Sequence, residues 1–203
     1  MVARYFLFVL LLLPFISFCD VITADGSIDY TIGTTGQSCS LRGAIINANA
    51  DSIIDTNCPT GNGTDTILLT TSFTLSVTGR GENNGHQGDL DVTSNIIVIG
   101  SSPDITINAN GIDRIFDVFG GHLIGIKLEN LTLTNGYDNG FPGDVNMGGA
   151  IRTTTEPYVI LDNVNILSNI VDLSSKFEAI QASAGVLAAG IFRASQIFFM
   201  RSP

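Results

Sequence analysis

The segment Asn130-Leu131-Thr132-Leu133-Thr134-Asn135 decides the fold, because similar segments recur at a fixed spacing. The next copy is Asn163-Val164-Asn165-Ile166-Leu167-Ser168-Asn169, and Ile197-Phe198-Phe199-Met200 follows it. The apolar positions lie 33 residues apart in two series, which are Leu131, Val164, Ile197 and Leu133, Ile166, Phe199. Apolar and polar residues alternate in the first copy, Leu131-Thr132-Leu133-Thr134, as they do in a half-buried β-strand.

Similar short strands, separated by turns rich in glycine and asparagine, precede these copies from Asp65 onward. Such a repeat predicts a solenoid, in which each turn of chain, or rung, buries its apolar side chains against the next rung. The dipeptides Asn110-Gly111 and Asn135-Gly136 supply positive φ angles at the corners. Helical repeats fit less well, because a 3.6-residue period is missing. We expect an all-β fold of parallel rungs over residues 65–203, with surface loops at 137–147 and 172–184.

The first 19 residues have the features of a signal peptide. Arg4 precedes an apolar run over residues 5–18, which is too short for a comfortable membrane span. We place cleavage after Cys19. Cleavage after Ala24, a lipoprotein site at Cys19 and an uncleaved anchor are the alternatives. Charged and polar residues interrupt a later apolar stretch, 179–200, so we expect no membrane span in the mature chain.

Residues 20–64 are predicted to form an N-terminal cap on the solenoid, beginning with an edge strand. A short helix is indicated at 40–49, with Ser40 as its N-cap and one apolar face made by Leu41, Ala44, Ile45 and Ala48. Once the signal peptide leaves, Cys39 and Cys58 remain, and an even pair in an exported chain predicts a disulfide.

A family resemblance rests on Cys39-Ser40-Leu41-Arg42-Gly43-Ala44-Ile45, a second cysteine and Gly63-Thr64-Asp65-Thr66-Ile67. This pattern resembles the start of the CSLREA-domain proteins, as do segments 88–92 and 112–118. Gly148-Gly149-Ala150-Ile151 is similar to the repeats of polymorphic outer membrane proteins. The resemblance covers about residues 20–170. It implies a secreted or surface-displayed right-handed parallel β-helix whose short capping helix carries Ser40, Leu41, Arg42, Ala44 and Ile45.

Gly43 departs from that family pattern, which has glutamate at this position. A glutamate would complete a capping box with Ser40, and glycine weakens the first helical turn by about 1 kcal/mol. We therefore expect Gly43→Glu to raise the melting temperature.

Composition excludes several classes of function. The net charge of −10 and the lack of a basic stripe in the sequence argue against nucleic acid as a partner. The sequence has no phosphate loop, zinc signature or nucleophile elbow, so no cofactor and no metal are expected. His86 and His122 lie in glycine-rich turns and are expected to be exposed.

Parallel β-helices include polysaccharide lyases and hydrolases, which use carboxylates on an exposed face. Asp89 and Asp91 are the best candidates for such a pair, because residues two apart on a strand share a face. A solvated strand edge is the favoured interpretation, and we expect no catalytic residue. Asp138 and Asp144 share a loop that could bind calcium loosely, although a solvated loop is favoured. Asn62 and Asn130 begin glycosylation sequons.

We therefore expect a non-catalytic surface module for adhesion or interaction, whose partner is an unknown protein or glycan at the cell surface. The alternative is the N-terminal part of a carbohydrate-active β-helix enzyme, similar to a polysaccharide lyase or glycoside hydrolase. The sequence stops within a rung at Arg201-Ser202-Pro203, so we expect a truncated chain.

Overall fold

The computed structural model describes residues 21–138, 148–172 and 192–194, which form a mostly β fold with one short helix. The helix, α1, spans Leu41–Ala50. The strands are β1 (Val21–Ala24), β2 (Asp65–Leu69), β3 (Phe73–Thr74), β4 (Leu90–Val92), β5 (Ile96–Gly100), β6 (Thr106–Asn108), β7 (Phe116–Phe119), β8 (Gly125–Thr134), β9 (Tyr137–Asp138), β10 (Ile151–Thr154), β11 (Tyr158–Leu167), β12 (Ile170–Val171) and β13 (Phe192–Ala194).

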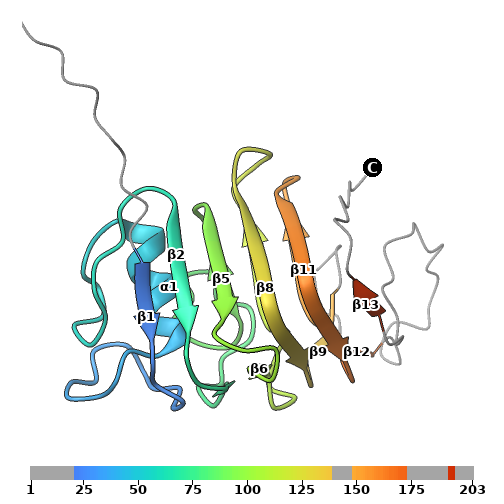
Figure 1. Ribbon diagram of the computed structural model, residues 1–203, viewed down its shortest axis with the longest axis horizontal. Helices are drawn as coiled ribbons and strands as arrows, with labels where there is room; N and C mark the ends of the chain where they lie inside the picture. Colours follow the sequence, from blue (N-terminus) through green and yellow to red (C-terminus); the bar gives the residue numbers. More distant parts are fainter. Residues whose placement is uncertain (1–20, 139–147, 173–191, 195–203) are drawn as a thin grey trace, which may run out of the picture.

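The strands are stacked in parallel sheets. The largest sheet has the order β1-β2-β5-β8-β11, and Figure 1 shows these strands side by side with a common direction. Strand β3 pairs with β6, and β6 pairs with the second half of β8. A second parallel sheet has the order β4-β7-β10, and β9 pairs with β12 in a third. The chain therefore returns repeatedly to the same positions, one strand further along the stack each time.

The pairing register confirms the 33-residue spacing between the first two copies of the repeat. Leu131 lies opposite Val164, and Leu133 lies opposite Ile166. The same spacing relates β9 to β12, where Tyr137 lies opposite Ile170. The apolar residues of each strand consequently stack on those of the next strand and form one continuous core. One such row consists of Ile22, Ile67, Val98, Leu128 and Leu161.

The last described strand, which precedes the third copy of the repeat, differs from the predicted stack of parallel rungs. We expected a further parallel strand, but β13 pairs with β11 in the antiparallel direction, with Ala194 opposite Val164. An antiparallel partner needs only a reversal of the chain, whereas a parallel one needs a full crossover. Ile197 and Phe199 lie outside the described residues, as do most of the two predicted surface loops. The first of those loops begins with β9.

The corners of the stack use left-handed backbone conformations, as the sequence predicted. Asn110 and Asn135 have φ angles of 56° and 57°. Asn130 and Asn163 also lie in this region, each with a φ of 52°, and the amide of Asn163 donates a hydrogen bond of 2.9 Å to Asn130 Oδ1. Asparagine tolerates this conformation better than most residues, so stacked asparagines mark one corner.

Helix α1 covers the end of the stack next to β1 and β2 (Figure 1). The predicted apolar face is confirmed, because Leu41, Ala44, Ile45 and Ala48 are all buried in the core. The predicted cap is also confirmed, because Ser40 Oγ accepts a hydrogen bond of 3.0 Å from the Gly43 amide. Among the described residues, no helix combines the length and apolarity needed to cross a membrane.

Candidate functional site

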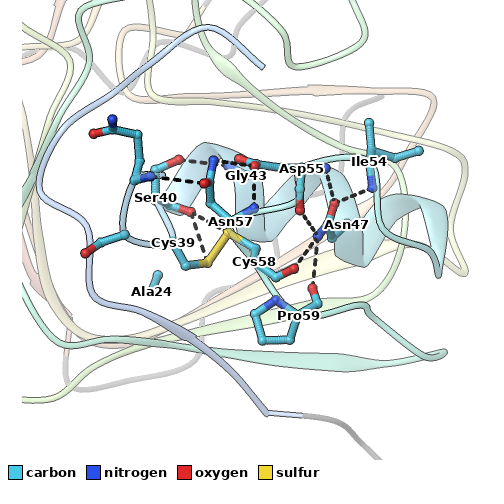
Figure 2. The surroundings of a disulfide bond; sticks show 12 residues. Ala24, Cys39, Ser40, Gly43, Asn47, Ile54, Asp55, Asn57, Cys58 and Pro59 are labelled. Atoms are coloured by element: carbon cyan, nitrogen blue, oxygen red, sulfur yellow. Dashed lines mark hydrogen bonds between the residues drawn. A yellow bond between two sulfur atoms is a disulfide. The ribbon is translucent and has the colours of Figure 1, made fainter. Parts of the chain in front are cut away.

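The predicted disulfide between Cys39 and Cys58 is present and buried (Figure 2). It joins the residue before the N-cap of α1 to the loop that follows the helix. The two cysteines are separated by 19 positions, and closing a loop of that size stabilises a fold by about 3 kcal/mol. A buried disulfide of this kind indicates an oxidising compartment of the extracellular type.

Asn47 organises the loop that carries Cys58, a role that the sequence did not reveal. Its side-chain amide donates to the carbonyls of Asp55, Cys58 and Pro59, and its Oδ1 accepts from the amides of Ile54 and Asp55 (Figure 2). Asn47 is fully buried. One side chain thus replaces the water that the loop backbone would otherwise bind.

Gly43 is required by packing, which argues against the expectation that Gly43→Glu would raise the melting temperature. A Cβ atom at this position would lie 2.1 Å from Asp55 Oδ2 and 3.0 Å from Cys58 Sγ. The disulfide and the Asp55 side chain, which accepts a hydrogen bond from Tyr30, occupy the space that a glutamate would need. Glycine here allows the helix and the disulfide loop to approach each other closely.

Arg42 is a fully buried cation at the centre of the cap. Its guanidinium pairs with both oxygens of Asp29, at 2.7 and 3.1 Å. Its other donors reach the carbonyls of Gly85, Gly88 and Asp89, at 2.8, 2.8 and 3.1 Å. All five N–H groups of the arginine are therefore used. Arg42 fastens the segment 79–88, which precedes β4, to the helix.

Asp89 and Asp91 lie beneath this segment and are buried, with exposures of 2% and 1%. The expectation of a solvated strand edge was therefore wrong. The backbone amide of Gly85 donates to Asp91 Oδ2 at 2.5 Å, so the segment 79–88 closes over the carboxylates. The two residues do lie close together, as their spacing predicted, but an exposed catalytic face is not formed by this pair.

A third carboxylate, Asp117, completes a buried cluster. One oxygen atom from each of Asp89, Asp91 and Asp117 can be chosen so that all three lie within 4.8 Å of one another. Asp117 is the register partner of Asp91 on the neighbouring strand β7, and Arg152 on β10 is the next residue in the row. The repeated pattern Leu90-Asp91-Val92 and Phe116-Asp117-Val118 was the sequence signal that could have revealed this pair.

Two arginines pair with the cluster. Arg114 Nε lies 2.8 Å from Asp89 Oδ2, and Arg152 Nε donates to Asp117 Oδ1 at 3.0 Å. A second contact joins Arg152 Nη2 to Asp117 Oδ2. Asp113, which is also buried, lies 3.6 Å from Arg114 Nε. Buried carboxylates are tolerated here because the guanidinium groups of Arg114, which precedes β7, and of Arg152, on β10, accompany them.

The burial of three of these carboxylates raises their pKa values. Loss of hydration, followed by the nearby charges of Asp113 and Asp91, raises the pKa of Asp89 to about 8, although Arg114 opposes the shift. Burial raises the pKa of Asp91 to about 7; the Gly85 amide lowers this pKa and the Asp117 charge raises it. Burial also raises the pKa of Asp113. The cluster can therefore take up a proton or a cation near neutral pH.

The remaining predicted residues are scattered. His86 and His122 are exposed, as expected, and Asn62 is exposed in its loop, whereas Asn130 is half-buried. Asp138 is buried and accepts a hydrogen bond from the Gly148 amide, so it is not a solvated loop residue; Asp144 lies outside the described residues.

A shallow groove of about 320 Å³ lies at the corners of successive strands. It is lined by Asn110, Gly111, Asn135, Gly136, Tyr137, Ser168 and Ile170. The lining has no charged side chain. It combines amide and hydroxyl groups with the Tyr137 ring and with Ile170, which is 55% exposed.

No family model, curated protein or solved structure matches this chain. Inferences about function therefore rest on the geometry described above.

Proposed function

We propose that this chain is an exported right-handed parallel β-helix that serves as a non-catalytic module for adhesion or surface interaction. In this proposal, residues 1–19 are a signal peptide, and α1 with its disulfide caps the N-terminal end. The stacked parallel sheets and the 33-residue register support the solenoid. The disulfide supports export.

The observation that carries the functional proposal is the row of polar side chains on successive strands. Thr106, Thr132 and Asn165 are register partners on β6, β8 and β11. The amide of Asn165 donates to Thr132 Oγ1 at 3.4 Å. A regular, half-buried surface of this kind offers repeated hydrogen-bonding groups at the strand spacing of about 4.8 Å. It suits recognition of an extended partner.

The shallow groove at the corners that follow β6, β8 and β11 is the best contact point for such a partner. Among the described residues, neither the side-chain amide of Asn110 nor the hydroxyl of Ser168 has a hydrogen-bond partner, so both are available to a ligand. Tyr137 contributes an aromatic ring, with the Arg80 guanidinium 5.1 Å from its centre. Neutral polar groups next to an aromatic ring fit a glycan, whose hydroxyl groups need hydrogen bonds and whose C–H faces need apolar contact.

Glycan-array binding and polysaccharide degradation should be measured on the chain beginning at Asp20. We expect binding without turnover, and weaker binding by Tyr137→Ala. The matched control is Ile53→Ala, which removes an exposed apolar side chain from the loop after α1. An equal loss of glycan binding in both variants would show that the groove is not the binding site. Turnover of a polysaccharide would favour the alternative, a carbohydrate-active β-helix enzyme.

A further inference from the structure

The buried carboxylates beneath the segment 79–88 carry more negative charge than the neighbouring arginines can balance. Four buried carboxylates lie there, from Asp89, Asp91, Asp113 and Asp117. Three arginines face them, and these are Arg114, Arg152 and Arg80, the last of which is 3.9 Å from Asp113. The charge of Arg42 is already balanced by Asp29. Glu82 and Asp138 add further negative charge nearby. Uncompensated charge in a buried site is costly unless a counter-ion or a proton joins it.

One oxygen of this cluster has no partner. Asp91 Oδ2 binds the Gly85 amide, but Asp91 Oδ1 is buried and makes no hydrogen bond among the described residues. Asp91 is 1% exposed, so bulk water does not satisfy this oxygen. Asp113 Oδ2 is likewise buried without a hydrogen-bond partner among the described residues. Buried polar atoms of this kind need a ligand or a proton.

The spacing of the three nearest carboxylates suits a single ion. Their oxygens lie within 4.8 Å of one another. Two oxygens bound to one Ca²⁺ at about 2.4 Å each can be at most about 4.8 Å apart. The pairs with Arg114 and Arg152 do not exhaust Asp89 and Asp117, because each ionised carboxylate has about four lone-pair sites.

The geometry points to a structural calcium site formed by Asp89, Asp91 and Asp117. Oxygen donors alone favour a hard cation over zinc or copper. Ca²⁺ fits better than Mg²⁺, because Mg²⁺ demands a near-ideal octahedral arrangement, whereas Ca²⁺ accepts irregular arrangements of carboxylate and other oxygens. The site does not depend on what the exposed faces of the protein bind.

The bound ion would hold the segment 79–88 on the β4-β7-β10 sheet. Gly85 connects the two, because its amide binds Asp91 and its carbonyl binds Arg42. Neutralising Asp91 and Asp117 with one cation removes the repulsion between these register partners.

Calcium titration of the full secreted chain after chelator treatment tests this site. We expect isothermal titration calorimetry to show one calcium ion per chain and the melting temperature to rise as calcium is added. Asp91→Asn keeps the shape of the side chain but removes its charge. We expect this variant to weaken calcium binding more than about tenfold and to lose the calcium-dependent rise in melting temperature.

The matched control is Asp104→Asn, which changes an exposed carboxylate outside the cluster and should leave calcium binding unchanged. The proposal would be overturned if the folded wild-type chain shows no calcium binding, which would leave protons as the compensating charge. It would also be overturned if Asp91→Asn binds calcium as the wild type does. The wild-type titration decides the matter even if Asp91→Asn does not fold.

Discussion

Asp91 and Asp117 are register partners on neighbouring parallel strands, so two buried carboxylates lie side by side under the segment 79–88. Such a pair is unfavourable when both groups are ionised, because the low-polarity surroundings screen their repulsion poorly. Arg152 relieves the repulsion from one side, beyond Asp117.

In chelator, we expect the protein to lose stability as the pH rises from about 4 toward 8. The folded-state pKa values of Asp91 and Asp89, about 7 and about 8, are above the ordinary value of 3.8. The folded state therefore holds protons that the unfolded state has released, and deprotonation favours unfolding. The stabilisation that these protons provide is complete below pH 3.8. It is lost as the pH rises through the folded-state pKa values of about 7 and about 8.

Thermal unfolding across this pH range, with Asp91→Asn alongside the wild type, measures the effect. The variant cannot ionise at residue 91, so its melting temperature should decline less steeply. Parallel curves for the two proteins would show that Asp91 does not cause the dependence.

Gly43→Glu should lower stability by about 1–3 kcal/mol, since it forces atoms into a filled space. The added Cβ alone would meet the Asp55 carboxylate and the Cys58 sulfur. The comparison is Ala50→Glu, which introduces the same side chain at an exposed position of the same helix and should change stability by less than about 0.5 kcal/mol. Urea unfolding of both variants measures the difference, and equal stabilities would contradict the packing role of Gly43.

Arg42→Lys should destabilise the fold by about 3–5 kcal/mol, although it conserves the charge. Lysine cannot replace five directed N–H donors, so the carbonyls of Gly85 and Gly88 would lose their partner. Lys127→Ala is the control, because its pair with Glu129 is on the surface, where ion pairs contribute about 0–1 kcal/mol. Chemical denaturation of the two variants provides the measurement. A tolerated Arg42→Lys would show that charge alone matters at this position.

Replacing Cys39 and Cys58 together by serine should cost about 3 kcal/mol, because the unfolded chain regains the freedom of the closed loop. The wild type in reductant is the internal reference, and its stability should fall to about that of the double variant. Differential scanning calorimetry in the presence and absence of reductant checks this. An unchanged melting temperature in the double variant would mean that Asn47 and packing hold the loop without the disulfide.

The repeated pattern and the disulfide were accessible from sequence because both depend on regularities along the chain. A 33-residue period places Leu131 beside Val164 in any stack of parallel strands, and the structure has this pairing. The apolar face of α1 follows from helical spacing in the same way. Once Cys19 is assigned to the expected signal peptide, Cys39 and Cys58 leave a single intramolecular pairing, and the structure has it.

The acidic cluster could be predicted only in part. Asp89 and Asp91 stood out because they are near neighbours in sequence, but their burial depends on the segment 79–88 folding back over them. Asp117 and Arg152 reach the same place from other strands, through pairings that span 26 and 35 residues. A search for one fixed repeat period does not detect two spacings that differ from each other.

Sequence by itself determined that this chain is built from short stacked strands, with a capping helix and a disulfide, because periodicity and capping act over a few residues. Tertiary structure alone decided that Gly43 has no room for a side chain, that Arg42 joins the helix to a distant segment, and that three aspartates meet out of contact with water. Those outcomes depend on which distant atoms fill the same volume, and packing of that kind leaves no mark on the local pattern of residues.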